Sequence, residues 1–477
     1  MKEPIDLEPL FPDRASGEAL GAQLVRRLRR AIETGFFPPA VRLLPTRELA
    51  KRLGVARNTV AFAFDQLVAE GYLEARIGAG TFVSTSIGCV KARSASSQRA
   101  LPRRAAALAA AKAELDRVGS SFGPLRAGVP DLTLFPFHAW QRLARKHLHA
   151  TRAYLHYGES PGLRALREAI SRHIAQFRGV VADPDQVVVV EGAQGAMHLI
   201  ALALTQPGDA IAIEDPCYQH ARAVFRTHRL ALRAVPVDEM GMRTDELPQE
   251  AALAYVSPSH QFPLGVALPQ ARRIELLQWA RRANAYVIED DYDSEFDAHP
   301  LPSLQSLDRD GRVIYAGTFS KTLAPGLRLG YVVAPPHLAD AFRTARDVVS
   351  LGASAQLQAT LADFLGQGYF SRHVRRMVGV YERRRRIVVD ALARNLPAEF
   401  RVGPAQTGLH VAVRGSRNFD DVAAADSMGP GRRCLPFSPM CVRRKDCKGL
   451  LVGFSSADED AVAEAATALA RQLRGVR

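Results

Sequence analysis

The chain has 477 residues, more than one hydrophobic core ordinarily holds, so we expect two or more domains. With 47% apolar and 23% charged residues and no apolar run of membrane-spanning length, the composition is that of a soluble globular protein and excludes a membrane-spanning one. The acidic start shows no secretory signal and the five cysteines show no CxxC pairing, so we expect a cytoplasmic protein without a metal site. The net charge of +14 favours a polyanionic partner.

Residues 15–84 form the first predicted domain, which is mainly helical. Thr46 follows a proline and is expected to N-cap a short helix that ends at the turn residue Gly54. A second helix is predicted from near Arg57 to Gly71. Its core-facing positions, spaced as on one face of a helix, are Val60, Phe64 and Leu67.

The start of the second helix carries side chains of the types that a recognition helix offers to the major groove. Two short strands around Gly78–Gly80 would follow it as a wing, from which an arginine can reach phosphate. The block from about Gly17 to Val83 closely resembles the winged helix-turn-helix of the GntR superfamily of bacterial regulators, which implies binding to double-stranded operator DNA. The candidate DNA-contacting residues are Thr46, Arg47, Arg57, Asn58, Thr59 and Arg76.

Residues 85–122 differ in composition from both sides, since they are rich in Ala, Ser and Arg and poor in large apolar residues. We expect a basic interdomain linker that is helical around 105–118.

The remaining segment, 123–477, alternates short Val- and Ile-rich runs with helical patterns, which predicts an α/β domain with a mainly parallel sheet. Ligands of such sheets bind beyond the carboxyl ends of the strands. The predicted strands are 186–190, 210–215, 252–257, 285–290, 312–317 and 331–335.

Polar residues at these strand ends supply what a pyridoxal phosphate site requires: an amine, an acid for the ring nitrogen, a phosphate cradle and a ring to cover the cofactor face. The amine is Lys321, in the stretch "GTFSKTLAPGLRLGY". The acid is Asp290 or Asp291, which the spacing does not separate. The remaining candidates are Ala193 and Gln194 at a helix start, Ser320 and Arg328 for the phosphate, Tyr218 for the ring face and Tyr292 for the phenolic oxygen.

From about Phe122 onward the chain resembles fold-type I aminotransferases, and "LHYGESPGLRALREAI" (155–170) belongs to the same pattern. The resemblance implies that Lys321 forms the internal aldimine, that Asp290 pairs with the ring nitrogen, and that Tyr157 reaches the phosphate of a neighbouring subunit in a homodimer. The whole chain resembles the MocR-type regulators, which join a GntR-type reader to such a domain. That implies a pyridoxal-phosphate-dependent regulator of transcription that senses a small amine, an amino acid or a B6 vitamer.

Two positions depart from the pattern of working enzymes. Phe262, in "SPSHQFPLG", takes the place of an asparagine that supports the phenolic oxygen. Leu451, in "KGLLVGFSS", takes the place of the arginine that holds the substrate carboxylate, although Arg443 or Arg444 lies close enough in sequence to substitute. These departures favour sensing over efficient turnover and leave a half-reaction of transamination open. The alternative is an active aminotransferase that carries a DNA-binding module.

Overall fold

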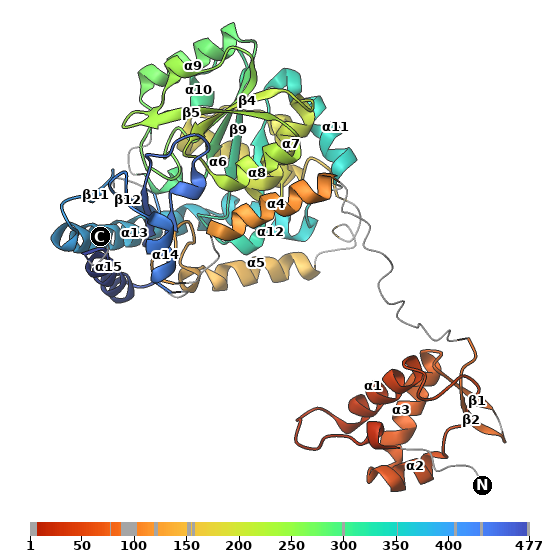
Figure 1. Cartoon of the computed structure of the whole chain (residues 1–477). Coiled ribbons are helices and arrows are strands. Elements are labelled where there is room, and N and C mark those ends of the chain that lie inside the picture. Colours follow the sequence, from red (N-terminus) through yellow and green to blue (C-terminus); the bar gives the residue numbers. More distant parts are fainter. Residues whose placement is uncertain are drawn as a thin grey trace. The chain divides into compact units, whose positions relative to one another are not determined.

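The computed structural model divides the chain into two units, Met1–Ala100 and Leu101–Arg477 (Figure 1). The structure describes residues 7–76, 78–86, 103–118, 123–149, 154, 158–297, 301–350, 352–404, 408–429 and 433–474. Tyr157, expected to contact the cofactor phosphate, lies outside these residues. In the described part of the chain, no helix is long and apolar enough to cross a membrane. Nor does this part group three or more His, Cys, Asp or Glu side chains in a way that would hold a metal ion.

Three helices and a hairpin build the first unit. They are α1 (Leu20–Glu33), α2 (Thr46–Leu53), α3 (Arg57–Ala69), β1 (Leu73–Arg76) and β2 (Gly80–Val83). Gly54 ends α2 with a left-handed φ of 63°, which glycine adopts without strain, so the chain turns and starts α3 three residues later. The antiparallel pair β1–β2, with Arg76 opposite Gly80, is the predicted wing. The predicted core positions of α3 are buried: Val60, Phe64 and Leu67.

An eight-stranded sheet forms the centre of the second unit, in the order β3-β10-β9-β8-β7-β4-β5-β6. Its strands are β3 (Val187–Val190), β4 (Ala210–Asp215), β5 (Ala231–Asp238), β6 (Gly241–Met242), β7 (Ala251–Val256), β8 (Tyr286–Asp291), β9 (Val313–Thr318) and β10 (Gly330–Val333). The five strands that lie side by side as β5, β4, β7, β8 and β9 pair in parallel. Strand β10 is antiparallel to both β3 and β9. This confirms the predicted α/β class with a mainly parallel sheet.

Helices cover both faces of this sheet, which explains why its strands read as continuous apolar runs. Residues on one face pack against α7 (Gly192–Leu204), α8 (Gln219–Thr227) and α11 (Ala339–Val349). The other face packs against α5 (Phe137–His149), α6 (Arg164–Arg178), α9 (Gln270–Arg282), α10 (Leu304–Leu307) and α12 (Ala355–Gly366).

A second sheet, antiparallel and four-stranded, has the order β11-β12-β14-β13. Its strands are β11 (Arg401–Val402), β12 (His410–Arg414), β13 (Leu435–Pro436) and β14 (Gly449–Gly453). The long helix α13 (Tyr369–Asn395), with α14 (Asp421–Ser427) and α15 (Glu459–Arg474), shares a hydrophobic core with it.

Helix α4 (Arg103–Val118) confirms the helix predicted around 105–118, and it belongs to the second unit. It packs on α8, where the Glu114 carboxylate accepts from the guanidinium groups of Arg222 and Arg226. Arg222 is 1% exposed and donates further to the carbonyls of Pro439, Met440 and Cys441. The buried Arg222 guanidinium of α8 therefore binds the Glu114 carboxylate of α4. This pairing is favoured because a buried charge requires a partner.

Candidate functional site

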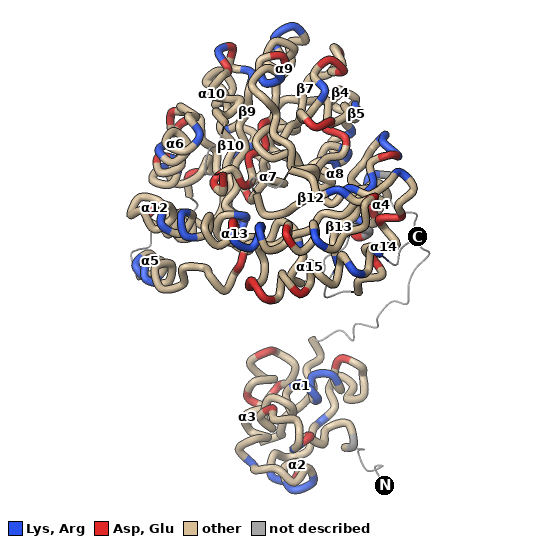
Figure 2. The backbone as a smooth tube through the Cα atoms, turned by 90° about the vertical axis from the view of Figure 1, so that its left-hand side faces the viewer, with Lys and Arg blue, Asp and Glu red and all other residues tan. Residues whose placement is uncertain are grey.

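The exposed start of α3 is the candidate DNA-reading surface of the first unit. Arg57 and Asn58 are exposed there and Thr59 is half-buried. Arg47 is exposed on the neighbouring helix α2, which is marked by Lys and Arg segments in Figure 2. Thr46 was expected to cap α2, and this expectation is wrong. Pro45 holds the N-cap position without any side-chain cap, and Thr46 is the first helical residue.

Arg76, at the end of β1, is exposed on the wing. Its guanidinium lies over the ring of Phe82, 4.7 Å from the centroid, and Nη2 donates to Glu74 Oε2 at 3.3 Å. Exposed ion pairs of this kind contribute little to stability, so the guanidinium can exchange Glu74 for a phosphate at small cost.

The position of Arg57 leads to a prediction about sequence reading. Arg57→Ala is expected to weaken binding to the natural operator by about 1–3 kcal/mol and to change binding to random DNA much less, because a base contact is lost. Arg76→Ala is the matched control, since loss of a phosphate contact should weaken both complexes equally. Fluorescence anisotropy at one fixed salt concentration measures both. If Arg57→Ala weakened binding to the operator and to random DNA equally, Arg57 would contact a phosphate and not a base.

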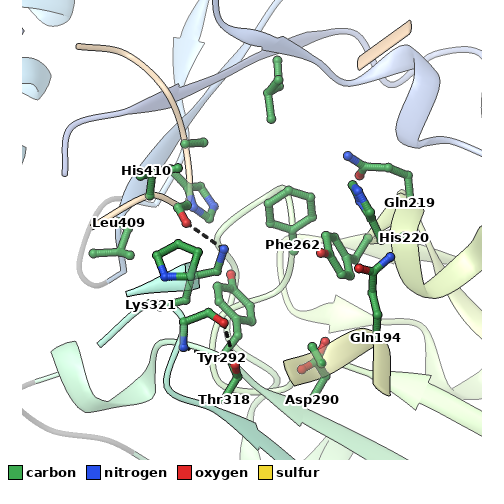
Figure 3. Close-up of a pocket in the computed structure, with 18 of the residues that line it drawn as sticks. Gln194, Gln219, His220, Phe262, Asp290, Tyr292, Thr318, Lys321, Leu409 and His410 are labelled. Atoms are coloured by element: carbon green, nitrogen blue, oxygen red, sulfur yellow. Dashed lines mark hydrogen bonds between the residues drawn. The ribbon is translucent and has the colours of Figure 1, made fainter. Parts of the chain in front are cut away.

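The second unit has a cavity of about 420 Å³ at the carboxyl ends of β4, β7, β8 and β9 (Figure 3). It is lined by the predicted site residues Ala193, Gln194, Tyr218, Asp290, Tyr292, Ser320, Lys321 and Arg328, whereas Asp291, the alternative acid, is not among the lining residues. They come together because parallel strands present their carboxyl ends at one edge of the sheet.

Lys321 follows β9 and is held by a carbonyl from a distant segment. Its Nζ donates to Gly128 O at 2.7 Å, drawn as a dashed line in Figure 3. A Cβ at Gly128 would stand 3.0 Å from that nitrogen, so glycine with its φ of 72° leaves the amine its place. Burial lowers the pKa of Lys321, against the charges of Asp293 and Asp290, which raise it. A larger share of the amine is therefore neutral and nucleophilic than in an exposed lysine.

The two candidate acids point to opposite faces of the sheet, as neighbours on a strand do. Asp290 lines the cavity, and Oδ2 accepts from the Tyr255 hydroxyl at 2.5 Å. Burial raises the pKa of Asp290 to about 6, so the carboxylate is mostly ionised at neutral pH. Asp291 instead accepts from Arg178 Nε at 2.6 Å and from the Tyr315 hydroxyl at 2.7 Å. The geometry favours Asp290 as the acid of the cavity.

Tyr292 and two histidines form a buried polar group beside Lys321. The Tyr292 hydroxyl donates to His260 O at 2.8 Å. His260 Nδ1 lies 3.0 Å from both that hydroxyl and Asp293 Oδ2, and its ring stacks on His410 with 4.7 Å between centroids. Burial keeps the pKa of His410 well below its ordinary value, so His410 is neutral. These contacts with His260 hold the Tyr292 hydroxyl in a defined position.

The first turn of α7 and Arg328 form a cradle for an anion. Backbone N–H groups at a helix start are free of helical partners and favour negative charge. Arg328 has a left-handed φ of 51°, and its Nη2 donates to Glu191 O at 2.8 Å, just before α7. A Cβ at Gly192 would come within 3.4 Å of the guanidinium, and one at Gly330 within 2.9 Å of Gly192 Cα. Glycine at both positions brings helix, strand and guanidinium together.

Tyr218 precedes α8 and forms part of an aromatic wall. Its ring stacks on His220, with centroids 5.2 Å apart, and meets Phe262 edge to face at 5.6 Å. Phe262, which replaces the expected asparagine, is itself edge-on to Tyr292 and His410. The Phe262 side chain therefore gives this wall an apolar ring, which offers no side-chain hydrogen bond to a ligand.

Leu451 lies in β14, fully buried in a cluster against which Ala127, Phe262 and Leu435 pack. Arg443 and Arg444 are not among the described residues that line the cavity. Arg444 donates to Val237 O and Asp446 instead. The described structure therefore gives neither of them the place of the missing arginine.

Several residues that line the cavity were not found from the sequence. They are Leu115, Arg126, Gly128, Gln219, His220, Tyr255, Thr318 and His410, together with smaller apolar neighbours. Tyr255 lies in the predicted strand 252–257 and Thr318 directly follows the predicted strand 312–317, a signal that could have been used. Gln219 and His220 directly follow the predicted site residue Tyr218, whereas Leu115, Arg126, Gly128 and His410 come from segments in which the sequence predicted no site residue.

The donor set around the cavity fits pyridoxal phosphate. An amine, an ionised carboxylate, a tyrosine hydroxyl and an anion cradle surround a single space, through Lys321, Asp290, Tyr292 and Arg328. Its volume of about 420 Å³ lies within the range of about 300–1,000 Å³ typical of small-molecule sites.

Both units match families of known proteins. Residues 20–83 match the bacterial regulatory proteins of the gntR family, and residues 125–429 match aminotransferase class I and II. In the second unit the chain is similar to LysN, the α-aminoadipate aminotransferase of Thermus thermophilus complexed with N-(5'-phosphopyridoxyl)-L-leucine. The TM-score is 0.71 at 26% identity, and the match covers 79% of this chain and 97% of LysN.

Relatives are also matched over nearly their whole length. The probable rhizopine catabolism regulatory protein MocR of Rhizobium meliloti is 36% identical, covering 96% of this chain and 95% of that protein. The pyridoxine biosynthesis transcriptional regulator PdxR of Corynebacterium glutamicum is 32% identical, with the same coverage. The chain therefore belongs to the MocR-type transcriptional regulators of the GntR family, in which an aminotransferase-like domain follows the DNA-binding helix-turn-helix.

Proposed function

We propose that this regulator binds pyridoxal phosphate at Lys321 and uses it to sense a small molecule with an amino group. The observation that carries the proposal is the convergence of Lys321, Asp290 and the α7–Arg328 cradle on one cavity. The phosphopyridoxyl adduct in LysN, which shares this fold, supports the same assignment.

When bound, the cofactor supplies an aldehyde that bonds covalently and reversibly to amines with release of water. The protein contributes the rest. Arg328, Ser320 and the amides of Ala193 and Gln194 would hold the phosphate, and Asp290 would keep the ring nitrogen protonated. The Tyr292 hydroxyl, which donates to His260 O in this structure, would donate to the phenolic oxygen instead, and Tyr218 would cover one face of the ring. Lys321 would supply the protein's own amine for that aldehyde.

We further propose that the effector site senses rather than turns over. Leu451 and Phe262 remove two groups that orient a substrate in enzymes of this fold, and lost orientation alone costs orders of magnitude in rate. The effector is an amine, an amino acid or a B6 vitamer, and the name of PdxR supports the last of these. The protein acts on operator DNA as a homodimer, which predicts two related half-sites.

The test is to titrate pyridoxal phosphate and a panel of amines against operator binding while assaying formation of keto acids. A regulator should show reciprocal coupling between effector and DNA of about 1–3 kcal/mol, because one equilibrium links the two sites. Turnover of an amino acid at about 1 per second or faster would favour the alternative, an aminotransferase that carries a DNA-binding module.

A further inference from the structure

We infer that Cys441 and Cys447 form a redox-active thiol pair, which peroxide converts into a reversible disulfide behind the wall of the ligand cavity. This inference goes beyond the proposed function, because the thiol chemistry requires no pyridoxal phosphate. Five residues separate the two cysteines in the chain, so the pair matches no CxxC motif. Disulfides that form in reducing compartments are usually transient and redox-sensing, and they require two thiols in contact.

The two thiols meet where the chain turns between β13 and β14. Phe437 N donates to Gly449 O at 3.0 Å, which pairs the two arms of the turn. Within it, Cys441 Sγ donates to Phe437 O at 3.6 Å and to Cys447 O at 3.9 Å. The Cys441 thiol also hydrogen-bonds the Cys447 side chain. Cys441 is half-buried and Cys447 is 9% exposed, so a small oxidant approaches the pair from the side of Cys441.

The surroundings of the pair give the two sulfurs different roles. The hydrogen bond from Cys441 lowers the pKa of Cys447 against the effect of burial, and the positive charges of Arg444 and Arg414 lower it further. The same hydrogen bond, together with burial, raises the pKa of Cys441. Because the thiolate is the nucleophile, Cys447 is the sulfur that attacks an oxidant and Cys441 is the one that resolves the product.

The reaction with hydrogen peroxide has two steps. The Cys447 thiolate attacks one peroxide oxygen, so an S–O bond forms as the O–O bond breaks, and the departing hydroxide takes a proton from solvent and becomes water. The Cys441 sulfur then attacks the Cys447 sulfur. The S–S bond forms as the S–O bond breaks, and the departing hydroxide leaves as a second water with the Cys441 proton. Two thiols are oxidised and one peroxide is reduced, and an added dithiol reverses the change by exchange.

The loop between the cysteines is held by two buried charged residues of the cavity region. The Asp215 carboxylate, at the end of β4, accepts from three consecutive backbone N–H groups at 2.8–3.0 Å: Val442, Arg443 and Arg444. Arg222, which binds the three carbonyls just ahead of this loop, also binds Glu114 of α4.

The pair also touches the cavity wall itself. Cys447 belongs to the buried cluster of Leu451, and Cys441 and Phe262 pack against that cluster. Phe262 in turn lines the cavity. A disulfide would close the loop covalently and hold it against this wall, so an oxidant would act as a second input at the ligand site.

The first experiment maps the disulfide. All variants are made in Cys89→Ser, which removes the cysteine outside the described residues. The reduced, cofactor-free protein is treated with a small excess of hydrogen peroxide at pH 7, remaining thiols are blocked with N-ethylmaleimide, and peptides are mapped without reduction. We expect Cys441 linked to Cys447, and dithiothreitol should release both thiols. Cys217→Ala and Cys434→Ala are the matched controls and should keep the disulfide, because burial raises the pKa of both thiols to about 12.

Single variants test the two roles. Peroxide should convert Cys447 of Cys441→Ser into a sulfenic acid that dimedone traps, since no resolving thiol remains. Cys441 of Cys447→Ser should be labelled about tenfold less, because burial raises its pKa even without its partner. Equal labelling of the two variants would overturn this assignment of roles.

Deuterium exchange tests the hold on the loop. Exchange of the amides of 442–444 should slow by about tenfold or more in the oxidised protein, because closing a short loop disfavours its local opening. Unchanged exchange in protein that carries the disulfide would overturn the proposed effect on the wall. The inference as a whole is overturned if peroxide leaves Cys441 and Cys447 free, or links them only to other cysteines. None of these measurements uses pyridoxal phosphate, so a protein that binds no cofactor would contradict the proposed function alone.

Discussion

Replacing Lys321 with alanine is expected to abolish covalent attachment of pyridoxal phosphate completely. Lys321 is the one amine among the described residues that line the cavity, and its Nζ is held there by Gly128 O. The wild-type protein incubated with cofactor should be yellow, and borohydride reduction should fix the cofactor to Lys321. In Lys321→Ala, peptide mass mapping after reduction should find no modified lysine in the cavity.

Two controls separate this effect from unfolding. Lys146→Ala, which removes an exposed lysine of α5, should keep both colour and labelling. Affinity of Lys321→Ala for random DNA should equal that of wild type, because the first unit folds around its own core. A wild-type protein that stays colourless in excess cofactor would rule out the assignment.

Replacing Asp291 with asparagine is expected to destabilise the second unit by about 3–5 kcal/mol. Asp291 and Arg178 form an ion pair whose side chains are 2% and 3% exposed, and removing one partner leaves an uncompensated buried charge. Both tryptophans of the chain, Trp140 and Trp279, belong to the second unit. Tryptophan fluorescence during urea unfolding therefore reports on that unit alone.

The half-exposed pair Asp238–Arg272 provides the comparison. Asp238→Asn should cost at most about 1 kcal/mol, because water screens and replaces exposed ion pairs. Combining Asp291→Leu with Arg178→Met should recover much of the loss, since neither partner of this pair is then left buried without the other. Equal destabilisation by Asp291→Asn and Asp238→Asn would show that the buried pair is not needed for stability.

The sequence was sufficient to predict features that depend on residues close together in the chain. The spacing of Val60, Phe64 and Leu67 placed the core face of α3, and Gly54 placed the turn before it. Lys321 was located because it lies three residues after a strand whose apolar run is unmistakable. Thr46 failed as a cap because Pro45, whose φ is fixed near the value needed at a helix entry, occupies that position.

Features that depend on tertiary partners were beyond the sequence. Asp290 and Asp291 are adjacent residues of the same type, so the sequence does not distinguish them. Only the hydrogen bonds from Arg178 and Tyr315 to Asp291 show that Asp290 is the one that faces the cavity. Strand β5 was missed because it carries Arg233 and Pro236 and is only partly buried, so it lacks the apolar run of its neighbours. The sequence gives no indication of Arg126 as a cavity residue. Its segment is placed by contacts with Gly453 of β14, which is more than three hundred residues away in the chain.

Helix α4 limits how such regulators can be cut and recombined. Leu115 lines the cavity, and Glu114, one residue before it, binds Arg222 and Arg226 of α8. Helix α4, at the start of the second unit, therefore supplies part of the ligand site. An effector domain expressed from residue 125, where the aminotransferase match begins, would lack this wall and report a ligand preference different from that of the full protein. Chimaeras that exchange readers between relatives should join ahead of residue 101, so that each cavity keeps its own helix. Exchanging this helix together with the reader would therefore change the ligand site as well as the choice of operator.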